Sequence, residues 1–182
     1  MTQVLVPLAN GCEELEAITI TDLLVRAGIN VTTAGLDDQP ITASRGTRII
    51  PDIDIQQVVD NNYDMIVLPG GLPGADHLRD DKRIQQLLIR HSQNNKFLAA
   101  ICAAPRALAS TGILDGKTVT CYPGALNNLS LNQTNITDSA IEVDGKIITS
   151  RGPGTAMDFA LMLIELLAGK AKRDEVNSQL VR

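Results

Sequence analysis

Short, nearly continuous apolar segments alternate along this chain with longer segments of helical periodicity. The alternation begins at once: an apolar run over 3–9 is followed by a helical pattern over 12–28 and by a second β-rich run over 30–36. Strands buried on both faces carry such continuous apolar runs, whereas strands with one wet face alternate apolar and polar residues. The pattern therefore predicts βαβ units and a mostly parallel sheet with helices on both faces, a three-layer α/β sandwich.

The same alternation continues to residue 170. Further strands are expected within 63–71, 96–101 and 145–154, and further helices near 81–95, 104–112 and 155–170. Residues 36–58 and 115–147 carry shorter β-like pieces, which are interpreted as hairpins or edge strands. No linker or repeat interrupts the pattern, so a single domain spanning 1–182 is expected.

Apolar side chains of the first helix are expected to form one broad buried stripe against the sheet. The residues of this stripe are Leu15, Ile18, Leu23, Leu24 and Val25. Gly28 is expected to end this helix.

Composition narrows the classes of partner. The net charge is -5 and aromatic residues make up only 2%, so neither a cationic nucleic-acid surface nor an aromatic stacking platform is expected. The N-terminal segment has no basic region before its apolar run, and the longest apolar helix is interrupted by Asp158 and Glu165. A soluble cytoplasmic protein without a membrane partner is expected.

The three cysteines, Cys12, Cys102 and Cys121, are an odd number and form no C-x-x-C pair. This spacing argues against a disulfide framework and against a thiolate zinc site. Free thiols and no bound metal are expected.

Cys102 lies where an apolar strand turns directly into a helix that Pro105 opens. Such a turn leaves the residue between the two elements strained and exposes its side chain at the rim of the sheet, as in a nucleophile elbow. Ala103 and the other small neighbours permit a tight turn, and the positive end of the helix dipole favours a thiolate. A nucleophilic role is the hypothesis, against the alternative of an inert packing cysteine.

Glu16 follows the first strand and lies near the face of the first helix that turns toward the sheet. A carboxyl buried beside a thiolate has its pKa raised, so that the pair shares one proton. Glu16 is therefore a candidate acid/base residue. Glu13 and Glu14, in the first turn, are interpreted as residues that complement the helix dipole.

The turn of Pro69, Gly70 and Gly71 follows another apolar strand. Glycine lets backbone N–H groups approach a bound oxygen closely, so this turn is a candidate oxyanion site, although an ordinary turn has the same composition. No G-K-[ST] follows it, and the segment "ANGCEE" lacks the glycines of a dinucleotide fingerprint. No nucleotide cofactor is expected.

A cysteine protease needs a histidine base, and the chain has only two histidines. His91 lies in a polar helix and is expected to be solvated. His77 follows the glycine turn and is placed either at the rim or on the surface. A Cys–His pair is weakly supported.

Several motifs together resemble the ThiJ/PfpI superfamily, and within it the Parkinsonism-associated deglycase branch. They span nearly the whole chain in the family order: "EELEAI" at 13–18, "DLLVRAGI" at 22–29, "SRG" at 44–46, "YDMIVLPGG" at 63–71, "AAICAAP" at 99–105 and "TSRGPGTAMDFAL" at 149–161. The combination is highly specific, whereas each motif alone is weak.

The resemblance implies a flavodoxin-like fold and a homodimer, with Cys102 at the elbow and Glu16 as its hydrogen-bonded partner. It also implies that the N–H groups of Gly71 and Ala103 form the oxyanion site. Arg45, which comes from the partner subunit in this family, and Arg26 are implied to lie near the dimer interface. Tyr122 and Arg45 are candidate neighbours of the site.

Two positions separate this chain from other family members. The peptidase branch carries a histidine directly after its cysteine, where this chain has Ala103, so proteolysis is not expected. The best-known members carry a histidine before the proline of the "CYPG" segment, where this chain has Tyr122. A mechanism that uses that histidine as a proton shuttle is not expected here.

Two functions follow from the resemblance. The first is a cofactor-independent glyoxalase or deglycase that acts on α-oxoaldehydes or on glycated adducts through Cys102 and Glu16. The second is an oxidative-stress sensor or chaperone in which Cys102 is oxidised to the sulfinate. Both use the same two residues.

Overall fold

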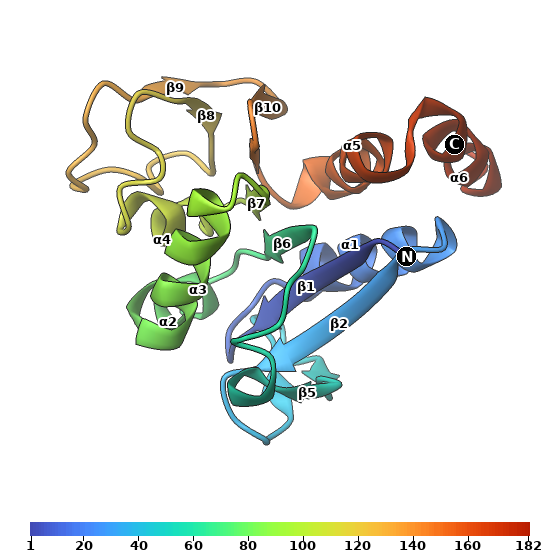
Figure 1. Ribbon diagram of the computed structural model, residues 1–182, viewed down its shortest axis with the longest axis horizontal. Coiled ribbons are helices and arrows are strands. Elements are labelled where there is room, and N and C mark those ends of the chain that lie inside the picture. Colours follow the sequence, from blue (N-terminus) through green and yellow to red (C-terminus); the bar gives the residue numbers. More distant parts are fainter.

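A seven-stranded sheet forms the centre of the computed structural model, which describes residues 1–182 (Figure 1). Its strands are β1 (Gln3–Leu8), β2 (Asn30–Gly35), β5 (Ile53–Asp54), β6 (Met65–Leu68), β7 (Phe97–Ile101), β10 (Ile141–Asp144) and β11 (Ile147–Ser150). Their order in the sheet is β10-β11-β7-β6-β1-β2-β5. All neighbours are parallel except β10, which runs antiparallel to β11 at the edge.

Two small sheets supplement the main one. Their strands are β3 (Ile41–Thr42) and β4 (Arg48–Ile49), which are antiparallel, and β8 (Thr118–Thr120) and β9 (Asn135–Thr137), which are parallel. The expectation of short hairpins and edge strands in these regions is confirmed, except that the β8–β9 pair is not a hairpin.

Helices pack in two groups. They are α1 (Glu14–Arg26), α2 (Gly74–Asp80), α3 (Lys82–Gln93), α4 (Pro105–Ala109), α5 (Ala156–Ala168) and α6 (Lys170–Gln179), with 3-10 turns η1 (Ile55–Gln57) and η2 (Pro153–Thr155). One group joins α1, α5 and α6, and the other joins α2, α3 and α4. The groups lie on opposite sides of the sheet (Figure 1), so the three-layer sandwich is confirmed.

The main strands are buried on both faces, as their continuous apolar runs predict. Every residue of β6 is buried, and in β1 only Gln3 is exposed. Helix and strand side chains together form one continuous cluster of 51 buried apolar residues. No helix combines the length and the apolar character required to cross a membrane.

The stripe expected on α1 is wrong in part. Leu23 and Leu24 are buried, but Leu15, Ile18 and Val25 are 50%, 49% and 59% exposed. At 100° per residue, the buried side of α1 passes through position 20 and the two buried leucines, and the three exposed residues project from the opposite side.

The order of the strands creates a switch point beside β1. The chain leaves β1 for β2 on one side and later returns to β6 on the other side. In open parallel sheets, ligands bind beyond the carboxyl ends of the strands at such a point. The carboxyl ends of β1, β6 and β7 meet there.

Candidate active site

Cys102 directly follows β7 and has a φ of +62°, in the left-handed region that residues other than glycine rarely adopt. Two backbone hydrogen bonds hold it: Cys102 N donates to Ser150 O at 2.9 Å, and Tyr122 N donates to Cys102 O at 2.8 Å. A residue in such a region costs about 1–3 kcal/mol and persists only where its surroundings fix it. The structure thus forms the strained strand-to-helix turn that the sequence predicts.

Glu16 lies on the sheet-facing side of α1 and is fully buried. Its Oε2 accepts a hydrogen bond from Gly70 N at 2.7 Å, and its carboxyl group lies close enough to Cys102 for the two groups to shift each other's pKa. A Cβ atom at position 70 would lie 2.7 Å from Cys102 Cβ and 2.9 Å from Glu16 Oε2. The glycine therefore allows the carboxyl and the sulfur to approach each other from two different elements.

Gly70 differs from its expected role. Its N–H donates to Glu16, so it positions the carboxyl and is not free to bind a substrate oxygen. The N–H groups of Gly71 and Ala103 instead act on Cys102, where they oppose the rise in the pKa of its thiol. These two groups remain as the candidate oxyanion donors.

Burial, and the repulsion between their negative charges, control the ionisation of the Glu16 carboxyl and the Cys102 thiol. Burial raises the pKa of Glu16 to about 7, against the opposing effect of the Gly70 hydrogen bond. Burial, together with the Glu16 negative charge, raises the pKa of Cys102 to about 12, against the hydrogen bonds from Gly71 and Ala103. Near neutral pH the pair therefore loses one proton and shares the other.

The sequence predicts a thiolate at Cys102, but Cys102 is a neutral thiol at rest when Glu16 is charged. The helix that follows Cys102 has only five residues, and the positive end of its dipole is outweighed by burial and by the neighbouring carboxylate. When the remaining proton lies on Glu16, the repulsion disappears and the sulfur can carry the charge. The nucleophile and the proton donor are thus generated by one transfer.

A cavity of about 290 Å³ opens above the Cys102 sulfur. Its lining comes from residues that follow β1, β6, β7, β8 and β11, and the segment 44–45 joins them. The lining residues are Glu13, Ser44, Arg45, Gly71, Leu72, Cys102, Ala103, Tyr122 and Pro153.

Arg45 reaches this cavity from the same chain. The Glu14 carboxylate accepts hydrogen bonds from Arg45 N at 3.0 Å and from Thr47 N at 3.2 Å, and Ser44 Oγ donates to it at 3.1 Å. Glu14 therefore anchors the loop that carries Arg45. The expected contribution of the partner subunit's Arg45 stays a prediction.

Four lining residues were not among the sequence candidates: Glu13, Ser44, Leu72 and Pro153. Each lies within or next to a motif that the sequence analysis names, but their convergence depends on the order of the strands. The sequence predicts only that Glu13 complements the helix dipole, whereas in the structure Glu13 also lines the Cys102 cavity.

Neither histidine lines this cavity. His77 Nδ1 lies 3.0 Å from Asn10 O. His91 was expected to be solvated, but it is buried, and burial lowers its pKa to about 4. It follows Ile84, Leu87 and Leu88 on the buried face of α3, so helical spacing explains the error.

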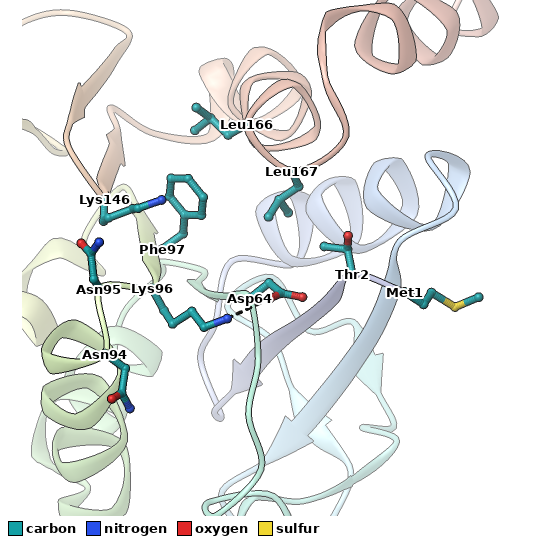
Figure 2. Close-up of a pocket in the computed structure, with 10 residues that line it drawn as sticks. All are labelled: Met1, Thr2, Asp64, Asn94, Asn95, Lys96, Phe97, Lys146, Leu166 and Leu167. Carbon is teal, nitrogen blue, oxygen red and sulfur yellow. Dashed lines mark hydrogen bonds and ion pairs between the residues drawn. The ribbon is translucent and has the colours of Figure 1, made fainter.

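A larger cavity, of about 560 Å³, lies at the amino ends of the strands, opposite the Cys102 cavity (Figure 2). It is lined by residues that precede the strands, among them Thr2, Asp64 and Lys96. Its lysines have partners: Lys96 Nζ lies 3.0 Å from Asp64 Oδ1, and Lys146 Nζ lies 3.7 Å from the ring centre of Phe97. No cysteine lines it, so the smaller cavity, which Cys102 lines, is the candidate active site.

Comparisons with known proteins agree with this architecture. Protein DJ-1 homolog B of Arabidopsis thaliana is 40% identical over 181 residues, covering 98% of this chain and 41% of the plant protein. This chain therefore spans less than half the length of that relative. Glutathione-independent glyoxalase DJR-1.2 of Caenorhabditis elegans is 35% identical over 164 residues, covering 90% of this chain and 87% of that protein.

Structural similarity extends over the whole fold. The crystal structure of Drosophila melanogaster DJ-1beta matches with a TM-score of 0.95 and 43% identity, covering 99% of this chain and 97% of that chain. The model of the DJ-1/PfpI family matches residues 2–166. The chain therefore belongs to the DJ-1/PfpI family.

Proposed function

We propose that this protein is a cofactor-independent enzyme that converts α-oxoaldehydes such as methylglyoxal into 2-hydroxy acids such as lactate. The observation that carries the proposal is the buried Glu16 carboxyl group beside Cys102, which lines a solvent-open cavity. The relative named as a glutathione-independent glyoxalase supports the substrate class. Glycated adducts of the same aldehydes are further candidate substrates.

The first step joins sulfur and substrate. The Cys102 thiolate attacks the aldehyde carbon and forms a C–S bond, and the carbonyl electrons move to the oxygen. The N–H groups of Gly71 and Ala103 stabilise this oxyanion until it takes the proton held by Glu16. The product of the step is a neutral hemithioacetal, with Glu16 now ionised.

The second step moves a hydrogen between neighbouring carbons. The Glu16 carboxylate removes the proton from the former aldehyde carbon, and the electron pair forms a C=C bond to the adjacent carbon while the carbonyl oxygen there takes the proton of the hemithioacetal hydroxyl. Glu16 then returns its proton to the adjacent carbon, and the C=O bond forms at the former aldehyde carbon. The product is a lactoyl thioester on Cys102. Water then attacks the thioester, the C–S bond breaks, and lactate and the free thiol are released.

Arg45 and Tyr122 have supporting roles in this proposal. Arg45 lines the cavity, so its positive charge favours the binding of the second substrate oxygen there. Tyr122 is 52% exposed and forms part of the wall. Since Tyr122 occupies the position of the family histidine, Glu16 alone carries the proton transfers to and from carbon.

The test of this proposal is the formation of lactate from methylglyoxal in an amine-free buffer, without glutathione, by wild type and Cys102→Ala. Wild type is expected to release lactate, and Cys102→Ala is expected to match the buffer blank. Equal lactate formation by the two proteins would overturn the proposal.

A redox role is the second candidate function. The Oε1 atom of Glu16 is buried without a hydrogen-bond partner. A protonated Oε1 beside the sulfur is available to donate a hydrogen bond to an oxygen of Cys102 sulfinate. Three buried free thiols fit a reducing compartment such as the cytoplasm.

A further inference from the structure

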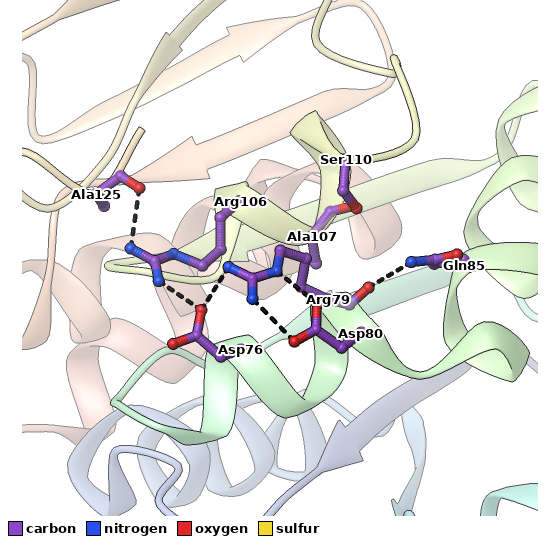
Figure 3. A network of polar contacts seen from close by, with 8 residues as sticks. All are labelled: Asp76, Arg79, Asp80, Gln85, Arg106, Ala107, Ser110 and Ala125. Atoms are coloured by element: carbon purple, nitrogen blue, oxygen red, sulfur yellow. Dashed lines mark hydrogen bonds and ion pairs between the residues drawn. The ribbon is translucent and has the colours of Figure 1, made fainter. Parts of the chain in front are cut away.

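Arg106, in the first turn of α4, lies at the centre of a polar network outside the cavity (Figure 3). Its Nη1 donates to Asp76 Oδ1 of α2 at 2.5 Å, and its Nη2 donates to Ala125 O at 3.0 Å. Its side chain is only 17% exposed. One guanidinium group therefore joins three segments that are far apart in the sequence.

Each of these three segments is the continuation of a wall of the Cys102 cavity. Asp76 follows Ala75, whose N–H donates to Gly71 O at 2.9 Å. Arg106 N itself donates to Ala103 O at 3.3 Å. Ala125 N donates to Tyr122 O at 2.8 Å. Arg106 is thus one or two hydrogen bonds away from both candidate oxyanion donors and from the tyrosine wall.

The two candidate oxyanion donors come from different loops. Gly71 ends the β6 strand region and Ala103 follows β7, and neither N–H group is bonded to the other segment. Their spacing therefore depends on how α2 and α4 sit against each other. An oxyanion site loses most of its effect when its donors move away from the position of the developing charge.

We propose that Arg106 is a positioning residue that clamps α2 and α4 together, so that the N–H groups of Gly71 and Ala103 stay directed at one point above Cys102. The Asp76 carboxylate is its partner in this clamp. The charged hydrogen bond between them is partly screened from water, which favours a strong and directional contact. Arg106 does not touch the substrate.

Arg79 provides a matched control. Its guanidinium also binds Asp76 Oδ1, at 2.7 Å, and otherwise binds Asp80 at 2.7 and 2.8 Å. All these contacts remain within α2, so Arg79 does not join α2 to α4. The variants to compare are Arg106→Met and Arg79→Met, because methionine keeps most of the aliphatic packing of arginine.

The first measurement is the rate of Cys102 alkylation by iodoacetamide as a function of pH. The N–H groups of Gly71 and Ala103 favour the thiolate, so their displacement in Arg106→Met is expected to raise the pH midpoint of alkylation by roughly half a unit or more. Arg79→Met is expected to keep the wild-type midpoint. The other titratable groups that face Cys102 are unchanged in both variants: Glu16 from α1 and, in the cavity, Glu13, Arg45 and Tyr122.

The second measurement is steady-state turnover of methylglyoxal, which rests on the proposed function. Arg106→Met is expected to lower kcat roughly 10-fold or more with little change in KM, because displaced oxyanion donors affect the transition state more than the bound substrate. Arg79→Met is expected to stay within about twofold of wild type. If wild type has no turnover but the alkylation midpoint shifts, the proposed function fails and the role of Arg106 stands.

Alkylation midpoints that are equal in wild type, Arg106→Met and Arg79→Met would overturn the inference. If Arg106→Met does not fold, Asp76→Asn replaces it, since this change removes the charge from the clamp and keeps the size of the side chain. The same upward shift is then expected, and an unchanged midpoint in folded Asp76→Asn would overturn the inference equally.

Discussion

Among the single residues of the site, Glu16 is expected to lower the free energy of unfolding at the pH values at which its buried carboxyl group ionises. Burial raises its pKa from 4.5 to about 7, so the native state is favoured below pH 4.5 and loses this advantage as the pH rises toward 7. A shift of this size corresponds to about 3 kcal/mol. Glu16→Gln keeps an acceptor for Gly70 N but cannot ionise. Urea unfolding at pH 8 should therefore show it to be more stable than wild type, with the difference vanishing near pH 4.5; a difference independent of pH would contradict the assignment.

Access is expected to decide which cysteine reacts with peroxide. Cys102 lines a solvent-open cavity, whereas Cys12 is fully buried and Cys121 is 5% exposed. Limiting peroxide should modify Cys102 before the other two, as read by mass spectrometry of the peptides. Modification of Cys121 first would contradict this expectation.

The sequence predicts individual site residues well where their signal is local. Cys102 is recognisable from the strand that precedes it and from Pro105 after it. The role of Gly70 was not predictable in the same way, because its contact with Glu16 joins residues 54 positions apart. The raised pKa of Cys102 also follows from burial and from the position of Glu16, which no local pattern contains.

At the scale of elements, the loop 43–47 is positioned by the first turn of α1. Glu14 accepts hydrogen bonds from the backbone of this loop, so Glu14→Ala should release Arg45 from the cavity. We expect KM for methylglyoxal to rise by roughly 3- to 10-fold with a smaller effect on kcat, consistent with the loss of charged hydrogen bonds. Asp22→Ala, which removes an exposed ion pair on the same helix, is the control and should leave KM unchanged. A KM for Glu14→Ala equal to that of the control would contradict the role of the loop.

Elements with a strong apolar period were predictable, and two helices without such a period were not. The main strands of the core, such as β1, β6 and β7, coincide with the apolar runs of the sequence. Helix α6 was missed because Val176 is its only buried residue, so no apolar stripe marks it in the sequence. Helix α2 was missed because it has only seven residues, too few to show a helical period.

For the molecule as a whole, the apolar residues on the exposed side of α1 predict that two copies of the chain associate. Leu15, Ile18 and Val25 form an apolar surface on this helix, and such surfaces mark contacts with other proteins. A homodimer through this face is expected, so Ile18→Lys should sediment as a folded monomer at micromolar concentration. Ile89→Lys, on the exposed side of α3, should remain dimeric. A wild-type protein that sediments as a monomer would contradict this prediction.

Whether Glu16 moves protons for the Cys102 nucleophile can be decided by following aldehyde consumption and the Cys102 oxidation state in wild type, Glu16→Gln and Glu16→Asp. Glu16→Gln keeps the shape of the side chain but cannot transfer a proton, and Glu16→Asp keeps the acid but retracts it by one methylene. We expect Glu16→Gln to lower turnover by roughly 10²- to 10⁴-fold, as is typical of losing a general acid/base, while peroxide still oxidises Cys102. If Glu16→Gln turns over the aldehyde at the wild-type rate, Glu16 takes no part in the reaction.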